Sequence, residues 1–203
     1  MITIVDYGIG NLRSVQKAFE AVGAATRMIT RPDELAGADA IVLPGVGAFG
    51  DGMDNLRLAG LVDPLLAAVR SGRPFLGICL GMQLLFEESE EIGQHVGLGL
   101  LPGRVRRFSG ELKVPQIGWN QIAWRRPNAL SAGIVDGAYA YFVHSYYVEP
   151  ADPSCVLATT DYGIEYASVV GQGNVLGLQF HPEKSQAVGL RMLSNFVQWM
   201  EHS

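Results

Sequence analysis

The chain has 203 residues, a length that fits one domain with a large buried core. Hydrophobic residues make up 48% of it and charged residues 17%, which is typical of a compact globular protein and excludes a disordered one. The net charge of -5 argues against a general binder of nucleic acid or of an anionic membrane surface. A small basic cluster at Arg104, Arg106 and Arg107 is interpreted as a solvated face or a partner surface.

The sequence gives no sign of a membrane or secretory segment. No apolar run approaches the ~18 residues of a spanning helix, and residues 1–10 lack the basic region and cleavage pattern of a signal peptide. The two cysteines, Cys79 and Cys155, do not have the spacing of a disulfide framework. We therefore expect a cytoplasmic protein that binds neither membrane nor nucleic acid.

The first 90 residues alternate between short apolar runs and segments with helical spacing. Strands that alternate with helices indicate βαβ units and a mainly parallel sheet. The pattern predicts, in chain order, a strand at 2–6, a helix over 12–22, a buried strand at 40–44, a helix over 61–69 and a strand at 74–78.

The second half is richer in strand-like runs separated by turn residues: GRVRRF, YFVHSYYV, CVLATT and ASVVGQGNVLGLQF. We expect them to form hairpins, some joining the central sheet and others building a small antiparallel layer. Helical spacing returns over residues 190–200. Because no linker or repeat is visible, the sequence predicts one domain over residues 1–203. Its expected fold is α/β with three layers, in which helices flank a mainly parallel, mixed sheet.

The stretch PFLGICLGMQLLF, residues 74–86, places a cysteine between two glycines where a strand meets an apolar segment with helical spacing. A nucleophile on such a tight turn needs glycine on both sides, because the backbone conformation is unusual and neighbouring side chains would clash. The turn also directs the first helical N–H groups at whatever the nucleophile attacks. Gly77-x-Cys79-x-Gly81 thus fits a nucleophile elbow. From this motif alone, a cysteine that only fills the core fits equally well.

A cysteine nucleophile requires a base, and His181 is the best placed of the four histidines. It follows an apolar strand, whereas His144 lies inside a strand-like run and fits a structural role. Residues two apart in an extended backbone point to the same side, so Glu183 can reach the His181 ring and stabilise its protonated form. An isolated HPE is usually an ordinary loop. Together with the elbow it predicts a triad of Cys79, His181 and Glu183.

The glycine-rich segment GVGAFG, residues 45–50, matches the G-x-G-x-x-G pattern of dinucleotide-binding loops. However, Pro44 crowds its entry, and no acidic residue ends a strand ~20 residues later to bind a ribose. We interpret it as a flexible loop beside the elbow whose backbone N–H groups face a substrate. Neither a zinc-ligand spacing nor a P-loop is present, so the sequence predicts no metal and no cofactor.

Five motifs carry a family resemblance: PGVGAFGDGM, GICLGMQLLF, VPQIGWN, YFVHSYY and FHPEKS, in this order. They resemble the class I (triad) glutamine amidotransferases and, among these, the glutaminase subunits of imidazole glycerol phosphate synthase in histidine biosynthesis. The resemblance covers essentially the whole chain. It implies that Cys79 attacks the side-chain amide of glutamine, that His181 transfers the protons, and that Glu183 orients His181.

The resemblance also implies how the substrate and its product are handled. Ammonia released into water at neutral pH becomes ammonium, so in this family a (β/α)8 cyclase subunit docks over the site and uses the ammonia directly. A chain of 203 residues is too short to contain that barrel, and we expect it to form a heterodimer with the cyclase. The backbone N–H groups of Leu80 and of the glycine loop would hold the oxyanion, and the expected residues around the substrate are Gly45, Val46, Gly47, Gln83, Ser145 and Tyr146.

At the expected interface, Trp119 and Asn120 match the family pattern, and Tyr141 is a looser match. The family usually has histidine where this chain has Gln116. The alternatives are an amidotransferase of another pathway, such as pyridoxal phosphate or anthranilate synthesis, a catalytically inactive interaction subunit, and a cysteine peptidase or chaperone-like protein with a related elbow. The GWN and YFVHSYY blocks argue against another pathway. The joint presence of Cys79, His181 and Glu183 argues against an inactive subunit, and HPEKS after the last strand argues against a peptidase or chaperone-like protein.

Overall fold

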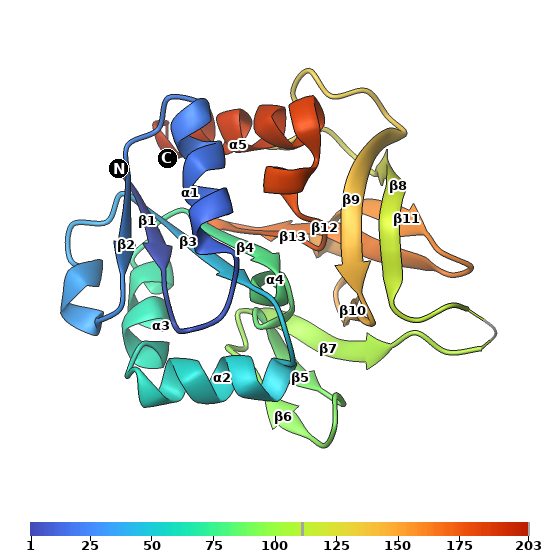
Figure 1. Cartoon of the computed structure of the whole chain (residues 1–203), viewed down its shortest axis with the longest axis horizontal. Helices are drawn as coiled ribbons and strands as arrows, with labels where there is room; N and C mark the ends of the chain where they lie inside the picture. The colour runs from blue at the N-terminus through green and yellow to red at the C-terminus, as the bar shows by residue number, and fades with distance from the viewer. Residues whose placement is uncertain (111, 203) are drawn as a thin grey trace.

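The computed structural model describes residues 1–110 and 112–202, which form a mixed β-sheet with helices on both faces (Figure 1). One half of the sheet is parallel, with strand order β2-β1-β3-β4-β13. Its central strands are buried along their whole length, which explains their continuous apolar sequences. The bounds are β1 Ile2–Val5, β2 Thr26–Ile29, β3 Ala40–Gly45, β4 Phe75–Cys79 and β13 Val175–Leu178.

Two pairs of helices cover the parallel half. Helices α1 (Leu12–Ala21) and α5 (Gln186–Met200) pack on one face, where the Phe19 and Phe196 rings meet edge to face with centroids 6.2 Å apart. Helices α2 (Phe49–Leu58) and α3 (Val62–Arg70) enclose a second core on the other face (Figure 1). The predicted three-layer α/β fold is confirmed. None of the helices in the described residues has both the length and the hydropathy to cross a membrane.

The other half of the sheet is mostly antiparallel. Strand β12 pairs with β13 and extends the sheet through β10, β7, β5 and β6, while β11, β8 and β9 branch from β12 as the predicted small layer (Figure 1). The bounds are β5 Phe86–Ser89, β6 His95–Val96, β7 Leu101–Arg107, β8 Gln116–Trp124, β9 Ala138–His144, β10 Tyr146–Pro150, β11 Val156–Asp161 and β12 Glu165–Gln172. Short 3-10 helices connect some of these elements: η1 Pro32–Leu35, η2 Pro153–Cys155 and η3 Pro182–Lys184.

Two expectations about single elements were wrong. The helix after Cys79 is one turn, α4 (Leu80–Gln83), because Phe86 already begins strand β5. The run YFVHSYYV is divided at Ser145 into β9 and β10, which pair with different neighbours. Both segments are apolar enough for a longer element, and only their pairing partners end them.

The glycine-rich segment is partly helical, which the sequence did not predict. Phe49 and Gly50 form the first turn of α2 instead of the end of a loop. Glycine lowers helix propensity, so the segment does not look helical by itself. In the fold, Gly50 packs against the His95 ring, and Gly52 lies against side chains of Leu80 and Leu84. Close packing of α2 on the elbow therefore explains these glycines.

Candidate active site

Cys79 lies at a sharp turn between β4 and α4. It is the last residue of β4, pairs with Gly45 of β3, and has φ 55° and ψ -110°. A non-glycine residue rarely adopts a positive φ, and such strain is concentrated at functional sites. A Cβ atom at Gly81 would collide with the Leu43 carbonyl oxygen, and one at Gly77 would lie 2.6 Å from the Gly81 oxygen. The predicted steric need for glycine on both sides of Cys79 is therefore confirmed.

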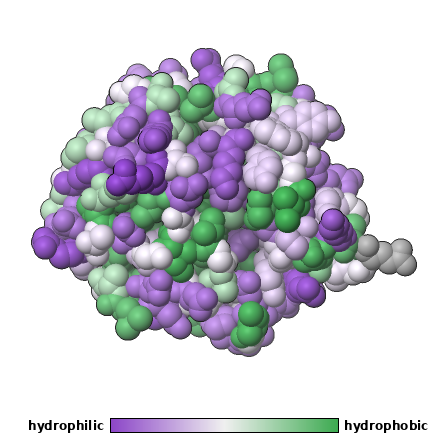
Figure 2. Space-filling model, in the orientation of Figure 1, coloured by the Kyte–Doolittle hydropathy of each residue, from purple (hydrophilic) through white to green (hydrophobic). Residues whose placement is uncertain are grey.

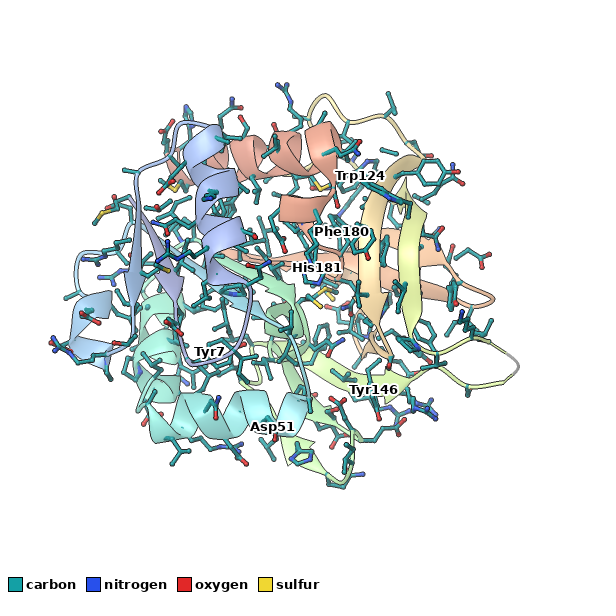
Figure 3. The ribbon with its side chains drawn as sticks, viewed as in Figure 1. Tyr7, Asp51, Trp124, Tyr146, Phe180 and His181 are labelled. Atoms are coloured by element: carbon teal, nitrogen blue, oxygen red, sulfur yellow. The ribbon has the colours of Figure 1, made fainter. Side chains whose placement is uncertain are left out.

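The structure brings Cys79, His181 and Glu183 together at the ends of two neighbouring parallel strands, β4 and β13. His181 Nδ1 lies 2.8 Å from Glu183 Oε1, and the side chains of both residues are almost fully buried. His181 also interacts with the Cys79 side chain, which contributes to its raised pKa, and both residues line the same cavity. Figure 3 shows His181 near the centre of the molecule, between the helical half and the β8–β9 hairpin.

The surroundings of His181 favour its protonated form. Burial lowers the pKa of this imidazole, but hydrogen bonds and charge interactions with Cys79 and Glu183 outweigh burial and raise the pKa to about 10. Glu183 Oε2 is buried and has no hydrogen-bond partner among the described residues, so within them its negative charge is balanced mainly through His181. A protonated ring beside the sulfur can give its proton to a leaving group, the acid–base role that a cysteine nucleophile requires.

A cavity of about 380 Å³ opens in front of the Cys79 sulfur. Gly45, although predicted at the substrate, does not line it: this glycine is buried against the Tyr7 hydroxyl and Leu80, where a side chain would not fit. The other predicted substrate-binding residues do line the cavity with Cys79 and His181: Val46, Gly47, Leu80, Gln83, Ser145 and Tyr146.

A family model described as "Glutamine amidotransferase class-I" matches residues 3–199 of this chain. The chain belongs to the class-I glutamine amidotransferases. Solved structures agree on the fold of the family. A structure described as a glutamine amidotransferase has a TM-score of 0.78 and 21% identity and covers 99% of this chain and 100% of its own. The structure of PurLQS from Thermotoga maritima has a TM-score of 0.78 and 21% identity, and it covers 99% of this chain and 97% of its own.

Curated relatives named "Imidazole glycerol phosphate synthase subunit HisH" match this amidotransferase over nearly its whole length. The protein of Syntrophotalea carbinolica is 58% identical over 203 residues, which cover 97% of this chain and 98% of the relative. The protein of Moorella thermoacetica is 50% identical, over 100% of this chain and 96% of the relative. The protein of Halobacterium salinarum is 54% identical, over 98% of this chain and 93% of the relative.

Gln83 of the amidotransferase is held in one orientation. Its Nε2 donates to the Tyr146 carbonyl at 3.0 Å and to Gln179 Oε1 at 3.1 Å. A carbonyl oxygen only accepts, so this end of the Gln83 amide must be the nitrogen. Its Oε1 is therefore the atom left to face the cavity. The Gln179 amide nitrogen in turn lies 4.0 Å from the Cys79 sulfur.

Sequence reasoning missed several residues at this cavity. Glu91 lines it from the β5–β6 connection and accepts a hydrogen bond from the Phe49 N–H at 2.6 Å, while burial raises the pKa of its carboxyl group. Nothing in the polar stretch EESEEIG distinguishes Glu91 from its neighbours. Lys184 also lines the cavity, and its place directly after HPE was a usable signal. Gln179 lies two residues before His181 in an apolar strand and could have been found as a buried polar residue.

The predicted interface residues lie near the cavity but differ in accessibility. Trp119 is 47% exposed and packs edge to face on Tyr141, over whose ring Lys184 Nζ lies at 5.9 Å. Asn120 instead donates to the Asp161 carbonyl at 2.8 Å, a contact that holds the β8 strand in place. Figure 2 shows hydrophobic groups gathered over strand β9 and towards the middle of this face.

Two further predictions concern surface charge and metal binding. Arg104 and Arg106 form ion pairs with Glu149, which makes this part of the basic cluster a neutralised, solvated surface. Within residues 1–110 and 112–202, no three His, Cys, Asp or Glu side chains are grouped as a metal site would require.

Proposed function

We propose that this amidotransferase hydrolyses glutamine to glutamate and ammonia as the glutaminase subunit of an imidazole glycerol phosphate synthase. The observation that carries the glutaminase assignment is the contact of Cys79 with the Glu183-bound His181 at the cavity. The pathway is supported by the shared name of the full-length relatives. We also propose that residues 1–203 act as one catalytic domain in the cytoplasm.

Two acceptors in the cavity fit the amino-acid end of glutamine. Gln83 presents Oε1, and Glu91 presents a half-buried carboxylate. An ammonium group donates hydrogen bonds and carries positive charge, so it is stabilised by both. The α-ammonium group of glutamine would lie there, with Ser145 and Tyr146 beside it. This places the side-chain amide towards Cys79.

The reaction follows from the positions of the triad. The Cys79 sulfur attacks the amide carbon of glutamine, and the C=O bond opens to an oxyanion held by the Leu80 N–H and one N–H of the Val46–Gly47 segment. His181 gives its proton to the leaving nitrogen, so ammonia departs and a thioester remains. Water, deprotonated by His181, then attacks the thioester. Glutamate leaves, and the thiol proton is shared again with His181.

Ammonia must leave this site without being protonated by bulk water. We propose that a (β/α)8 cyclase subunit docks over the cavity, next to Trp119 and Tyr141, and receives the ammonia directly. Gating belongs to this proposal: a peptide rotation within Gly45–Val46–Gly47 would complete the oxyanion hole only when the partner carries its ligand. Gly47 has φ 107° and Val46 is 41% exposed, so this segment can respond to a docked partner.

The test is glutamate release by the purified chain, alone and mixed with a cyclase subunit and its ribulosyl ligand. We expect slow release by the isolated chain and a large increase in the complete mixture. No increase with a pure, correctly folded chain would contradict the pathway and favour an amidotransferase of another synthase. Full activity of the isolated chain would contradict gating but not glutamine hydrolysis.

A further inference from the structure

A chain of buried polar residues leads from the first residue of β8 to the cavity. Gln116, Tyr166 and His144 are all nearly inaccessible to solvent. The Gln116 amide lies 3.0 Å from the Tyr166 hydroxyl, which lies 3.2 Å from His144 Nε2. His144 Nδ1 is 2.7 Å from the carbonyl oxygen of Tyr146, the oxygen that also holds Gln83.

The protons of His144 are fixed by its neighbours. The Tyr146 carbonyl can only accept, so His144 Nδ1 must carry a hydrogen. Burial lowers the pKa of His144 to about 4, with the nearby His181 acting in the same direction, so the ring is neutral at physiological pH. A neutral ring has one N–H, and His144 Nε2 is therefore a hydrogen-bond acceptor.

This acceptor decides the direction of the remaining bonds. Tyr166 has a single hydroxyl proton, which His144 Nε2 requires, so towards Gln116 the Tyr166 oxygen can only accept, as it can from the Thr160 hydroxyl. With its carbonyl oxygen towards Tyr166, Gln116 would supply no proton, and its buried Nε2 is left without a partner. The two ends of an amide have nearly the same shape, and hydrogen-bond logic decides between them.

We propose that Gln116 is a positioning residue of the glutamine site, whose amide nitrogen donates to Tyr166. The hydrogen bonds then run in one direction, from Gln116 to Tyr166, from Tyr166 to His144, and from His144 to the Tyr146 carbonyl. Tyr166 and His144 relay the direction of these hydrogen bonds to the Tyr146 carbonyl, and neither uses its bonds in this network to contact the substrate. A buried N–H without an acceptor is costly, so the orientation in which the Gln116 N–H donates to Tyr166 is favoured over the one in which it is unpaired.

The Tyr146 carbonyl connects this hydrogen-bond network to Gln83, the proposed substrate contact. It accepts from His144 and from Gln83, so a carbonyl fixed by His144 also fixes which atom Gln83 turns to the cavity. This step rests on the proposed glutaminase function, in which Gln83 Oε1 accepts from the substrate ammonium. Because Ile117 and Trp119 are exposed on the same strand as Gln116, the strand expected to meet the partner also orients the substrate contact.

The proton arrangement can be measured without any activity. In the full chain with 15N-labelled histidine, we expect His144 to show the neutral Nδ1–H tautomer by NMR, with its signals assigned by their loss in His144→Asn. At a pH high enough to ionise the new carboxyl group, Gln116→Glu offers only acceptor oxygens, so it should take the Tyr166 proton and leave Nε2 to be protonated. A wild-type Nε2–H tautomer, or His144 signals unchanged in Gln116→Glu, would overturn the proposal.

The effect on the substrate is measured with the chain in complex with the cyclase subunit. We expect Gln116→Leu to raise KM for glutamine about three- to tenfold with a smaller change in kcat, because one neutral hydrogen-bond donor is lost. Gln116→His, which keeps an N–H, should restore KM. Gln121→Leu, an exposed glutamine of the same strand, is the matched control and should leave KM unchanged.

Tyr166→Phe tests whether the residues act as one chain. Removing the hydroxyl breaks the same chain, so the double variant Gln116→Leu/Tyr166→Phe should be no worse than Tyr166→Phe alone. Additive losses, or equal falls in kcat for Gln116→Leu and Gln116→His, would contradict a positioning role. If the wild-type complex releases no glutamate, the proposed function fails, while the NMR measurement still decides the proton arrangement.

Discussion

Cys79 combines a strained backbone with a charged neighbour. Its positive φ is unfavourable for a residue with a Cβ atom, and the fold maintains it because the strand and helix on either side are buried. Cys155 is the natural comparison, since it is also buried but lies in a 3-10 turn without a histidine, where burial raises the pKa of its thiol to about 11. Burial alone thus makes a cysteine inert, and the contact with His181 distinguishes Cys79.

Replacing each cysteine separately tests this difference. We expect Cys79→Ala to lower glutamate release by about a thousandfold or more, because no other side chain at the cavity can form the thioester. Cys155→Ala should retain most of the activity. The measurement is kcat of the complex, with circular dichroism to check the fold. Cys79→Ala that still releases glutamate at the wild-type rate would contradict the triad.

Glu183 is expected to link stability to pH. The pKa of His181 is raised to about 10 in the folded chain, from about 6.5 in an unfolded one. The resulting stabilisation is complete below about pH 6.5 and is lost as the pH rises through about 10. Glu183→Gln removes one cause of the raised pKa. Its loss of unfolding free energy relative to wild type, from urea titrations, should be larger at about pH 6 than at about pH 10.

An equal loss at the two pH values would show that Glu183 acts only by packing. Glu183→Gln should also slow glutamine hydrolysis less than Cys79→Ala does, because orientation of the histidine is only part of the catalysis. Equal losses of kcat in the two variants would mean that Glu183 takes a direct part in the chemistry.

At the scale of elements, the elbow depends on how closely three segments approach. Gly81 begins its helical turn in van der Waals contact with the backbone of β3, and Gly77 lies under the same turn. The elbow helix is only four residues long, so its position is set by these contacts and not by helix propensity. The same close packing places the Leu80 N–H next to the Gly45–Val46–Gly47 segment.

Gly81→Ala should therefore unfold or strongly destabilise the chain. The added methyl group meets the Leu43 carbonyl oxygen, a backbone atom that cannot move away, and we expect a loss of about 3 kcal/mol or more. Gly23→Ala is the matched control. Gly23 has φ 86° with open space around it, so only the strained backbone conformation should lower the free energy of unfolding, by about 1 kcal/mol. Thermal unfolding compares the two, and similar losses would exclude crowding as the cause.

At the scale of the whole molecule, the mixed sheet gathers the site from both halves of the chain. The parallel half contributes the elbow and His181, and the antiparallel half contributes part of the cavity wall through Ser145 and Tyr146. The exposed side chains of Ile117, Trp119 and Tyr139 lie on the β8–β9 hairpin, whose residues Val143 and His144 line the cavity. A partner that seals the cavity would cover these groups.

Trp119→Ala should weaken association with the cyclase subunit. A large aromatic group at the centre of an interface commonly contributes about 2 kcal/mol, which corresponds to about a thirtyfold higher Kd. Because Trp119 is half exposed in the isolated chain, the Tm of the Trp119→Ala variant should differ little from that of the wild type. Val135→Ala, an exposed apolar residue outside the hairpin strands, is the control and should leave Kd unchanged. Equal Kd values for Trp119→Ala and wild type would place the interface elsewhere.

The sequence by itself determined the parallel core and the elbow, and it predicted that Cys79, His181 and Glu183 come together. Buried strands have continuous apolar runs, and an elbow needs glycines at fixed spacing, so both leave a local signal. His181 and Glu183 could be paired because residues two apart in an extended chain face the same side. The basic outline of the chemistry therefore lies in short stretches of sequence.

Only the tertiary structure decided which other groups reach the cavity. Glu91 and His144 come from distant segments, and their contacts depend on strand pairing that no local pattern specifies. The division of YFVHSYYV at Ser145 has the same origin, since the two strands pair with different neighbours. Hydrogen-bond direction also needs coordinates. The protons of Gln116, Tyr166 and His144 follow from which oxygen each nitrogen faces, a property of the folded chain.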